Sequence, residues 1–274
     1  MNRWVPQRLV RIAGFTVAVF GSVISCSANR VSLGETEERG GIRFMKGSIE
    51  PLDAIGYTLH DGTDRVFEEA SYRRGRRHGR AREYYADGQM AVEERYANGL
   101  MEGERREWHE NGQLKREETF VNGLNEGAIR EWLPGGELVL ERTMAAGQRD
   151  GTDISSYPNG QMERAATYEM GTLQGLRTVW YENGQKRLER TFVNGRAEGP
   201  SAEWYDDGTC WRETTWKVGK PHGPYTEWYQ SGEKKVEGVY ELGKLVAIQR
   251  WDESGRPVGE PTDTIPSEVT SNSI

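Results

Sequence analysis

The sequence predicts an all-β protein: an elongated, twisted antiparallel β-meander built from 24-residue β-hairpin repeats. Glycines recur at a constant 24-residue step in three series, many of them preceded by Asn or Asp. Nine Trp and twelve Tyr, most at fixed places in this repeat, stand in a chain that is only 35% hydrophobic. A constant period of this length is the sequence signature of a repeat architecture. The three series are Gly88, Gly112, Gly136, Gly160, Gly184, Gly208 and Gly232; Gly99, Gly123, Gly147, Gly171, Gly195, Gly219 and Gly243; and Gly103, Gly127, Gly151, Gly175, Gly199 and Gly223.

Two chain reversals are expected in every repeat. Asp87-Gly88 and Asn111-Gly112 are dipeptides that accept positive φ at both central residues of a type I′ turn, a strong hairpin signal. The second reversal, as in Asn122 to Gly127, is expected to be longer, with glycine at both ends. Two reversals leave room for two strands of about six to eight residues, so each repeat is one hairpin and successive hairpins continue one sheet.

Alternation along the strands assigns residues to the two faces of the sheet. Every second residue from Leu114 to Phe120 is expected on one face, which is largely apolar in the sister repeats. Glu117 and its equivalents form a row of carboxylates on the other face. Trp108 recurs at one position of the partner strand, and each buried aromatic ring removes about 150–250 Å² from water. Stacked aromatic rows can therefore stabilise a thin sheet.

Residues 1–25 are predicted to be a signal peptide. Three arginines precede an uncharged apolar run from Ile12 to Ile24, which is too short to span a bilayer comfortably. The run ends in Val23-Ile24-Ser25-Cys26, which resembles a bacterial lipobox, so Cys26 is the expected lipidation site. A plain secretory signal or an uncleaved anchor is the alternative. Residues 26–50 are then predicted to be a polar tether, 51–256 the repeat array and 257–274 a disordered tail.

The charge balance bears on partners. The chain carries a net charge of −7, and cleavage before Cys26 would leave 33 basic and 43 acidic residues, a net of −10. An acidic chain is not steered toward nucleic acid or anionic lipid headgroups. We therefore expect no nucleic-acid partner, and a membrane contact only through acyl chains on Cys26. The expected location is the bacterial envelope, as an exported, membrane-anchored lipoprotein facing the periplasm or the outer surface.

The sequence offers no reactive constellation, so we expect no enzyme, no catalytic residue, no metal site, no cofactor and no small-molecule substrate. The Glu117 row repeats in every unit, which is typical of a solvated sheet face rather than of a unique site. His78 and His222 occupy the same turn position six units apart, too far for joint metal ligation. Cys210 occupies the repeat position that Leu114 occupies in another unit, and we interpret it as a small hydrophobic residue.

The repeated phrase resembles the MORN-variant repeat. It reads Trp-Tyr-x-Asn-Gly-Gln, then an aromatic residue, then Asn-Gly-x-x-x-Gly, best in Trp180 to Gly199 and Trp108 to Gly127, and it covers about residues 57–255. Such bacterial arrays are commonly labelled YwqK-family antitoxins. The resemblance implies a MORN-like β-hairpin array without catalytic residues, used for protein or envelope contacts. A cytoplasmic antitoxin needs no signal peptide, so the predicted export signal favours an envelope role.

The leading hypothesis is a non-enzymatic, lipid-anchored envelope scaffold that binds a protein partner. Tyrosine is enriched at interfaces, so the tyrosines that follow the Trp positions are the candidate interaction surface, unless these rings only cover the second face of the sheet. These residues are Tyr85, Tyr157, Tyr181, Tyr205 and Tyr229. One alternative is a cell-wall polysaccharide or choline binder, whose repeats also combine a Trp-Tyr strand with an Asn-Gly turn. Another is an exported immunity or antitoxin protein.

Overall fold

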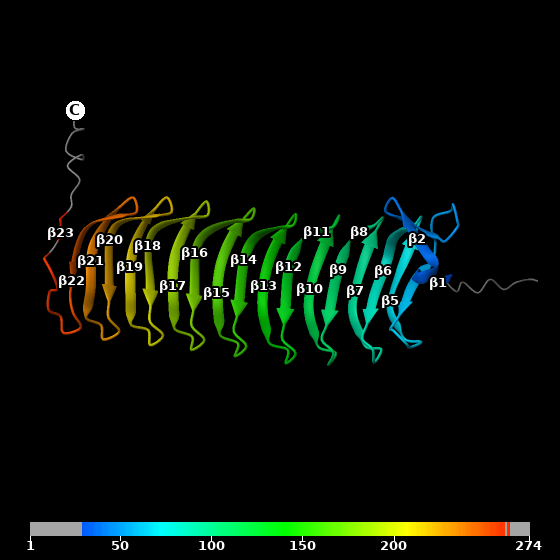
Figure 1. Ribbon diagram of the computed structural model, residues 1–274, viewed down its shortest axis with the longest axis horizontal. Helices are drawn as coiled ribbons and strands as arrows, with labels where there is room; N and C mark the ends of the chain where they lie inside the picture. The colour runs from blue at the N-terminus through cyan, green and yellow to red at the C-terminus, as the bar shows by residue number, and fades with distance from the viewer. Residues whose placement is uncertain (1–28, 261, 264–274) are drawn as a thin grey trace, which may run out of the picture.

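The computed structural model describes residues 29–260 and 262–263, which form one long sheet, whose strands from β4 onward follow each other in sequence order, and a separate two-stranded sheet of β2 and β3 (Figure 1). From β4 to β22 neighbouring strands pair antiparallel, as hairpin after hairpin. β8 and β9 are two parts of one strand that both pair with β7, and β11 and β12 likewise both pair with β10. The predicted all-β hairpin array is confirmed. One connection departs from the meander, because β1 pairs parallel with β4 and closes the N-terminal edge of the sheet.

The elements have the following bounds. The N-terminal part contains β1 (Arg30–Ser32), the 3-10 turn η1 (Leu33–Glu35), β2 (Thr36–Arg39) and β3 (Ile42–Met45). The array contains β4 (Ile55–Leu59), β5 (Val66–Arg73), β6 (Arg76–Tyr84), β7 (Met90–Ala97), β8 (Leu100–Met101), β9 (Gly103–Trp108), β10 (Leu114–Val121), β11 (Leu124–Asn125), β12 (Gly127–Trp132), β13 (Leu138–Ala145), β14 (Gln148–Ser156), β15 (Met162–Glu169), β16 (Thr172–Trp180), β17 (Lys186–Val193), β18 (Arg196–Trp204), β19 (Cys210–Lys217), β20 (Lys220–Trp228), β21 (Lys234–Glu241), β22 (Lys244–Arg250) and β23 (Thr262–Asp263).

The three glycine series have three different backbone roles, and the predicted turn type was assigned to the wrong series. Asn122 and Gly123 both have positive φ (51° and 81°), which makes the second reversal, not the first, the two-residue type I′ turn. At the first reversal only Gly88 has positive φ, and the three-residue loop closes through Tyr85 N–H to the Gln89 carbonyl at 2.9 Å. The preceding Asp is selected here for its side chain, which accepts the Gln89 N–H at 2.9 Å. The third series, Gly127 and its equivalents, lies at a β-bulge beside the type I′ turn.

A second bulge changes the predicted assignment of residues to faces. The pairing of β9 with β10 shifts between Leu114 and Arg116, so Lys115 is an extra residue. Leu114 pairs with Trp108 and Arg116 with Glu107. Directly paired residues share a face, so Leu114 lies on the face of Trp108, opposite to Arg116. The sequence-based alternation, which placed Leu114 with Glu118 and Phe120, is therefore wrong at this one position of each repeat.

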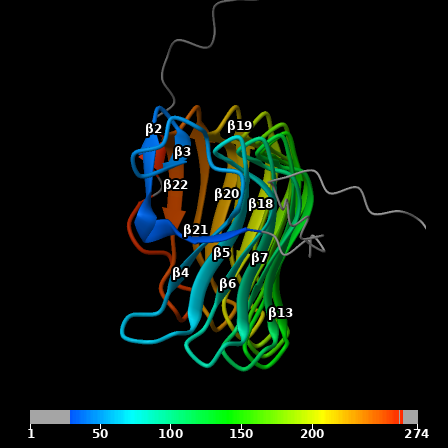
Figure 2. The same cartoon turned by 90° about the vertical axis from the view of Figure 1, so that its right-hand side faces the viewer.

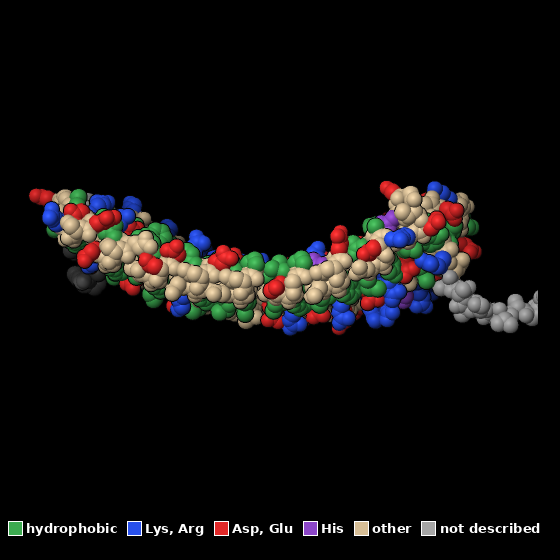
Figure 3. Space-filling model, turned by 90° about the horizontal axis from the view of Figure 1, so that it is seen from below, with side chains coloured by type: hydrophobic (Ala, Val, Ile, Leu, Met, Phe, Trp, Pro, Cys, Tyr) green, Lys and Arg blue, Asp and Glu red, His purple; other side chains and the backbone are tan. Residues whose placement is uncertain are grey.

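The sheet is a curved single layer. Figures 2 and 3 show that the array bows along its length and that the N-terminal hairpin β2–β3 lies on its concave side. This hairpin and its neighbours cap the end of the sheet around a small core of Leu52, Ala70, Tyr72 and Ala81. We call the capped side the concave face and the side that carries Trp108 the convex face.

The predicted tether is wrong for residues 29–50. These residues fold into β1, η1 and the β2–β3 hairpin, and the Arg43 main-chain N–H donates to the Gly75 carbonyl, in the first two-residue turn of the repeat array, at 2.9 Å. The polar composition misled the prediction because main-chain hydrogen bonds order these residues: β1 pairs with the edge strand β4, and β2 pairs with β3 in a separate two-stranded sheet. In the predicted disordered tail, Pro257 forms a bridge with Trp251 and β23 pairs with β22, so the described part of the tail is ordered.

The predicted signal peptide, including Cys26, lies outside the described residues. Within residues 29–260 and 262–263, no helix has the length and apolar character needed to cross a bilayer.

Candidate interaction surface

The concave face has a central row of side chains, one from each long strand, and the row changes character along the array. Register pairs such as Ala70↔Ala81, Glu118↔Arg105 and Asp153↔Ala166 define its members. The row consists of Ala70, Ala81, Glu94, Arg105, Glu118, Ile129, Arg142, Asp153, Ala166, Arg177, Arg190, Ser201, Thr214, Tyr225 and Gly238. Small side chains fill the capped end, and charged side chains follow them.

In the N-terminal half of this row, the charges are balanced. Arg105 lies between Glu94 and Glu118, with contacts of 3.3 and 2.9 Å. Glu118 is only 4% exposed and also binds Arg116 at 3.0 Å and Asn125 at 2.8 Å. Burial alone would raise the pKa of Glu118, but the hydrogen bonds and charges of Arg116 and Arg105 outweigh it and hold this pKa below its usual range. This part of the face is a closed ion-pair network.

In the middle of the row, one acid serves three arginines. Asp153 is fully buried, and its carboxylate contacts Arg142 and Arg149 at 3.1 Å and Arg164 at 3.3 Å. The three guanidinium groups cover the acid, whose single negative charge balances only one of their three positive charges. Positive charge therefore exceeds negative charge at this part of the row.

Farther along, two arginines face each other. Arg177 on β16 is the direct cross-strand partner of Arg190 on β17, an arrangement that is unfavourable for like charges. Arg190 binds Glu203 at 3.2 Å, but the same carboxylate oxygen also binds Arg212 at 2.6 Å. Burial lowers the pKa of Arg190, and Arg212 and Arg177 lower it further against the opposing effect of Glu203. Among the described residues, no carboxylate forms an ion pair with Arg177, and its buried Nε lacks a hydrogen-bond partner.

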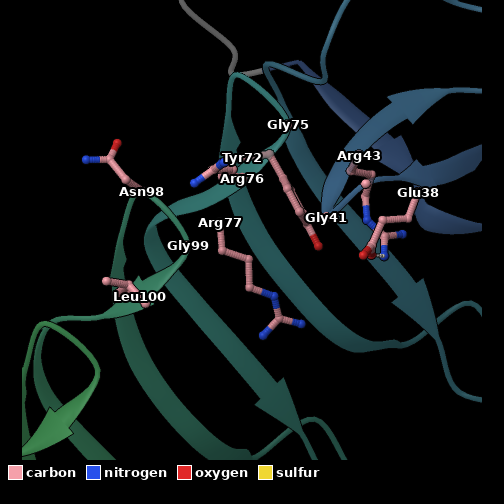
Figure 4. Close-up of a pocket in the computed structure, with 11 residues that line it drawn as sticks. Glu38, Gly41, Arg43, Tyr72, Gly75, Arg76, Arg77, Asn98, Gly99 and Leu100 are labelled. Atoms are coloured by element: carbon pink, nitrogen blue, oxygen red, sulfur yellow. Dashed lines mark hydrogen bonds and ion pairs between the residues drawn. The ribbon is translucent and has the colours of Figure 1, made fainter.

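Three hollows open on the concave face. The first, about 760 Å³, lies under the cap, where Glu38 and Arg43 of the cap face Tyr72 and Arg77 of the sheet (Figure 4). Within it, Arg43 binds Glu38 at 3.4 Å, and Arg77 binds Glu68 and Glu94.

The other two hollows lie over the middle and the C-terminal half of the array. One of them, about 510 Å³, lies over β9–β13 and is lined by the paired residues Arg105 and Glu118. The smallest, about 300 Å³, lies over β16–β19 and is lined by Arg177 and Glu203 together with residues near the three-residue turns.

The convex face is divided in a different way. Over the N-terminal half, cross-strand pairs of opposite charge alternate, as in Arg82 with Glu93 at 3.1 Å and Arg130 with Glu141 at 2.8 Å, and Figure 3 shows these colours gathered on the lower margin toward the right. These acids are the predicted carboxylate row. Over the C-terminal half, the equivalent cross-strand pairs lack the arginine. They are Ile154↔Ala165, Thr178↔Glu189, Ala202↔Glu213 and Thr226↔Glu237.

The structure gives the predicted tyrosines a packing role. Each hydroxyl donates a hydrogen bond to a main-chain carbonyl of the next repeat, which for Tyr85 is that of Trp108 at 2.6 Å and for Tyr181 that of Trp204 at 2.8 Å. The other three are Tyr157 to Trp180, Tyr205 to Trp228 and Tyr229 to Trp251, at 2.9–3.0 Å. These side chains are half-buried, and each stands at the start of a three-residue turn, so that they form one line along that edge of the sheet. Their role as a contact surface stays a prediction.

Sequence reasoning missed two further sets of repeat-to-repeat contacts. His60 and His109 stand where other units have tyrosine, and each Nε2 bonds to the equivalent carbonyl at 2.8–2.9 Å. At the other edge, the turn residue beside six of the bulges accepts the main-chain N–H of the residue 20 positions later, as Glu102 does from Asn122 at 2.8 Å. His78 and His222 occupy this acceptor position, which explains their spacing. The 24-residue period was the signal that could have revealed both sets.

Comparison with known proteins identifies the repeat. The MORN repeat variant family matches residues 77–98, 101–122, 173–194 and 221–242. The four starting positions differ by whole multiples of 24, and each segment ends on the first residue of a type I′ turn. The chain contains MORN-variant repeats. The MORN-variant assignment therefore agrees with the observed hairpin register.

Comparisons with curated proteins and with solved structures give the following results. No curated protein matches the chain. Among solved structures, the crystal structure of TcdB2-TccC3 matches 85% of this chain and 17% of its own chain, with 11% identity and a TM-score of 0.16. The chain thus spans about a sixth of that structure's chain. Within the described residues, no group of three His, Cys, Asp or Glu is placed to hold a metal ion.

Proposed function

We propose that this protein is a non-enzymatic, lipid-anchored scaffold of the bacterial envelope that binds a protein partner on its concave face. The observation that carries the proposal is the single-layer sheet, in which the concave face continues uncovered beyond the cap over the described strands. MORN repeats commonly serve in protein and membrane interactions, and repeat arrays offer extended concave surfaces for such contacts. The YwqK-family antitoxin label belongs with this proposal as one possible biological setting.

A protein partner on the concave face can be tested with neighbouring strand positions. Phe192 and Thr191 are adjacent on β17 and point to opposite faces, the first toward the concave side and the second toward the convex side. A photo-crosslinking amino acid at Phe192 should capture one discrete envelope protein in cells, and the same group at Thr191 should not. Equal capture at both positions, or no capture at either, would contradict the proposal.

The lipid anchor is tested separately at Cys26. Radioactive palmitate should label the wild-type chain and leave Cys26→Ala unlabelled, because the thiol is the acylation site of the predicted lipobox. Equal labelling of both chains would remove the anchor from the proposal. A secreted or uncleaved form would then replace it.

The same experiments separate the other candidate functions. A wall-polysaccharide or choline binder would sediment with purified cell walls and be released by the free ligand, with no crosslinked protein. An exported immunity protein would crosslink to a toxin encoded by a neighbouring gene. Either result would replace the general scaffold with a specific role.

A further inference from the structure

We propose that the concave face over β16–β19 binds the carboxylates of an extended acidic peptide segment, through Arg177, Arg187, Arg190 and Arg212. We call these four residues the arginine cluster. The inference rests on the proposed function and names the chemistry of the partner segment that the scaffold recognises.

The arginine cluster carries a surplus of positive charge. Arg177, Arg187, Arg190 and Arg212 share this part of the concave face with Glu203, and Glu227 on the next strand is the direct cross-strand partner of Arg212, so four arginines stand beside two acids. Glu203 uses a single oxygen for both Arg190 and Arg212. The surplus stands out in a chain whose net charge is −7 and whose N-terminal concave face has balanced ion pairs. An anionic ligand would supply the missing partners.

The arrangement is unfavourable without a ligand. Arg177 and Arg190 are opposed directly in the register, and the buried Nε atoms of Arg177 and Arg212 lack hydrogen-bond partners within the described residues. Unpaired buried donors destabilise a folded protein, and like charges opposite each other add to that effect. Strain of this kind is typical of a binding surface that a partner completes. The equivalent central-row pair three repeats earlier is Arg105↔Glu118, in which the two charges are opposite and form an ion pair.

The surroundings favour peptide carboxylates over sugar rings. Arg190 lies over the ring of Trp216 at 4.3 Å, Arg212 over Trp211 at 4.7 Å and Arg187 over Tyr181 at 5.8 Å. The guanidinium groups therefore occupy ring faces on which a sugar would stack. Stacking also holds each guanidinium plane in place, so that its outward N–H donors are presented for bidentate contact with a carboxylate.

The shape of the face favours a flexible chain over a membrane or a nucleic acid. The arginine cluster lies inside a surface that is concave along the array, and a flat bilayer would meet the ends of the array first (Figure 3). From Arg177 on β16 to Arg212 on β19 there are three strand steps, roughly 14 Å at 4.8 Å per strand. An extended peptide spans that distance in about four residues. Two carboxylates four residues apart would then reach both ends of the cluster, and both side chains would lie on the same side of the extended peptide.

The test uses the full chain in detergent and fluorescence anisotropy with a labelled peptide of about eight residues that alternates Glu and Ser. The wild type should bind this peptide and reject its Gln-Ser counterpart. Arg177→Gln should weaken binding by about tenfold, since one charge-assisted hydrogen bond is lost. Phosphatidylglycerol vesicles and an oligothymidine serve as competing anions. If either binds better than the peptide, and also depends on Arg177, the peptide assignment is wrong.

Two further measurements distinguish binding from structure. Arg177→Gln should raise the urea midpoint, because it removes a like-charge pair, while it lowers peptide affinity. Arg105→Gln is the matched control on the same face: it should lower the midpoint and leave affinity within about twofold, because Arg105 is already paired with Glu94 and Glu118. Unchanged affinity in Arg177→Gln would overturn the inference. If the Phe192 crosslink to a partner persists in that variant, only the inference fails; if no crosslink forms even in the wild type, the scaffold proposal fails.

Discussion

The hydroxyl group of Tyr181 donates a 2.8 Å hydrogen bond to the main-chain carbonyl oxygen of Trp204, 23 residues farther along the chain. The same bond recurs between several other neighbouring repeats. The bond joins the three-residue turn of one repeat to the end of a strand in the following repeat, so each repeat is held by its neighbour. Stability in such an array is a sum of repeat and nearest-neighbour contributions.

Tyr181→Phe should therefore destabilise the array by about 1 kcal/mol, since it removes one hydrogen bond and leaves the ring in place. The measurement is the urea midpoint together with hydrogen exchange of the amides around Trp204. Leu133 occupies the same position in a repeat that lacks the bond, and Leu133→Phe is the control that should change neither reading. A wild-type midpoint in Tyr181→Phe would show that the bond adds no net stability.

Met170→Asn should stabilise the protein by about 0.5–1 kcal/mol. Met170 is the first residue of a type I′ turn with φ 44°, a conformation that Asn adopts more readily, and its side chain is 72% exposed, so little packing is lost. The reverse change, Asn194→Met at the equivalent turn, should destabilise by a similar amount. Thermal unfolding of both variants checks the pair. Shifts of equal sign would contradict this account of the turns.

Gly151→Ala should be more destabilising than Gly175→Ala. Both glycines lie at the same bulge position with positive φ, 110° and 68°. A Cβ on Gly151 would lie 3.1 Å from Cβ of Thr143, whereas nothing lies within 4 Å of a Cβ on Gly175. We expect about 1 kcal/mol at Gly175 and about 2–3 kcal/mol at Gly151, from backbone strain with and without crowding. Urea unfolding of the two variants measures the difference. Equal losses of unfolding free energy would show that the positive φ alone, without crowding, sets the cost of the added Cβ.

Glu118→Gln should be destabilising at neutral pH and progressively less so in acid. The pKa of Glu118 is depressed in the folded state, so its ionised form contributes stability above the unfolded pKa, and that contribution is lost as pH falls through the folded pKa. Urea midpoints of both chains at pH 7, 5 and 3 should converge toward the lowest pH. Glu117→Gln, on the convex face, is the control. A constant gap between wild type and Glu118→Gln would mean that ionisation of Glu118 is not the cause.

The fold could be predicted from the sequence because its main determinant, the 24-residue spacing of turn glycines, is local. The details that failed depend on pairing. Asn111-Gly112 is a type I′ signal in isolation, but the Asn side chain accepts the Gln113 N–H at 3.0 Å and thereby closes a three-residue loop. Likewise, the bulge at Lys115 is invisible to an alternation pattern, because only the register with the partner strand shows that one residue is extra.

The interaction surface was harder to predict than the fold. The tyrosine series was chosen for its amino-acid type, and only coordinates could show that the Tyr181 hydroxyl is already engaged by the backbone. The arginine cluster gave no sequence signal, because Arg177, Arg190 and Arg212 are separated by 13 and 22 residues and are brought together by the strand register. Charge balance along a face becomes visible only once the pairs are known.

The lateral bonds between hairpins also determine how the array should respond to force. Every strand pair lies perpendicular to the long axis, and each hairpin is fastened only to the ones beside it, so tension applied at the two ends opens the terminal hairpin before any internal one. Each opening event releases one repeat of 24 residues, roughly 80 Å of extended chain. When a single molecule is stretched, the protein should therefore lengthen in equal steps, one for each repeat that opens.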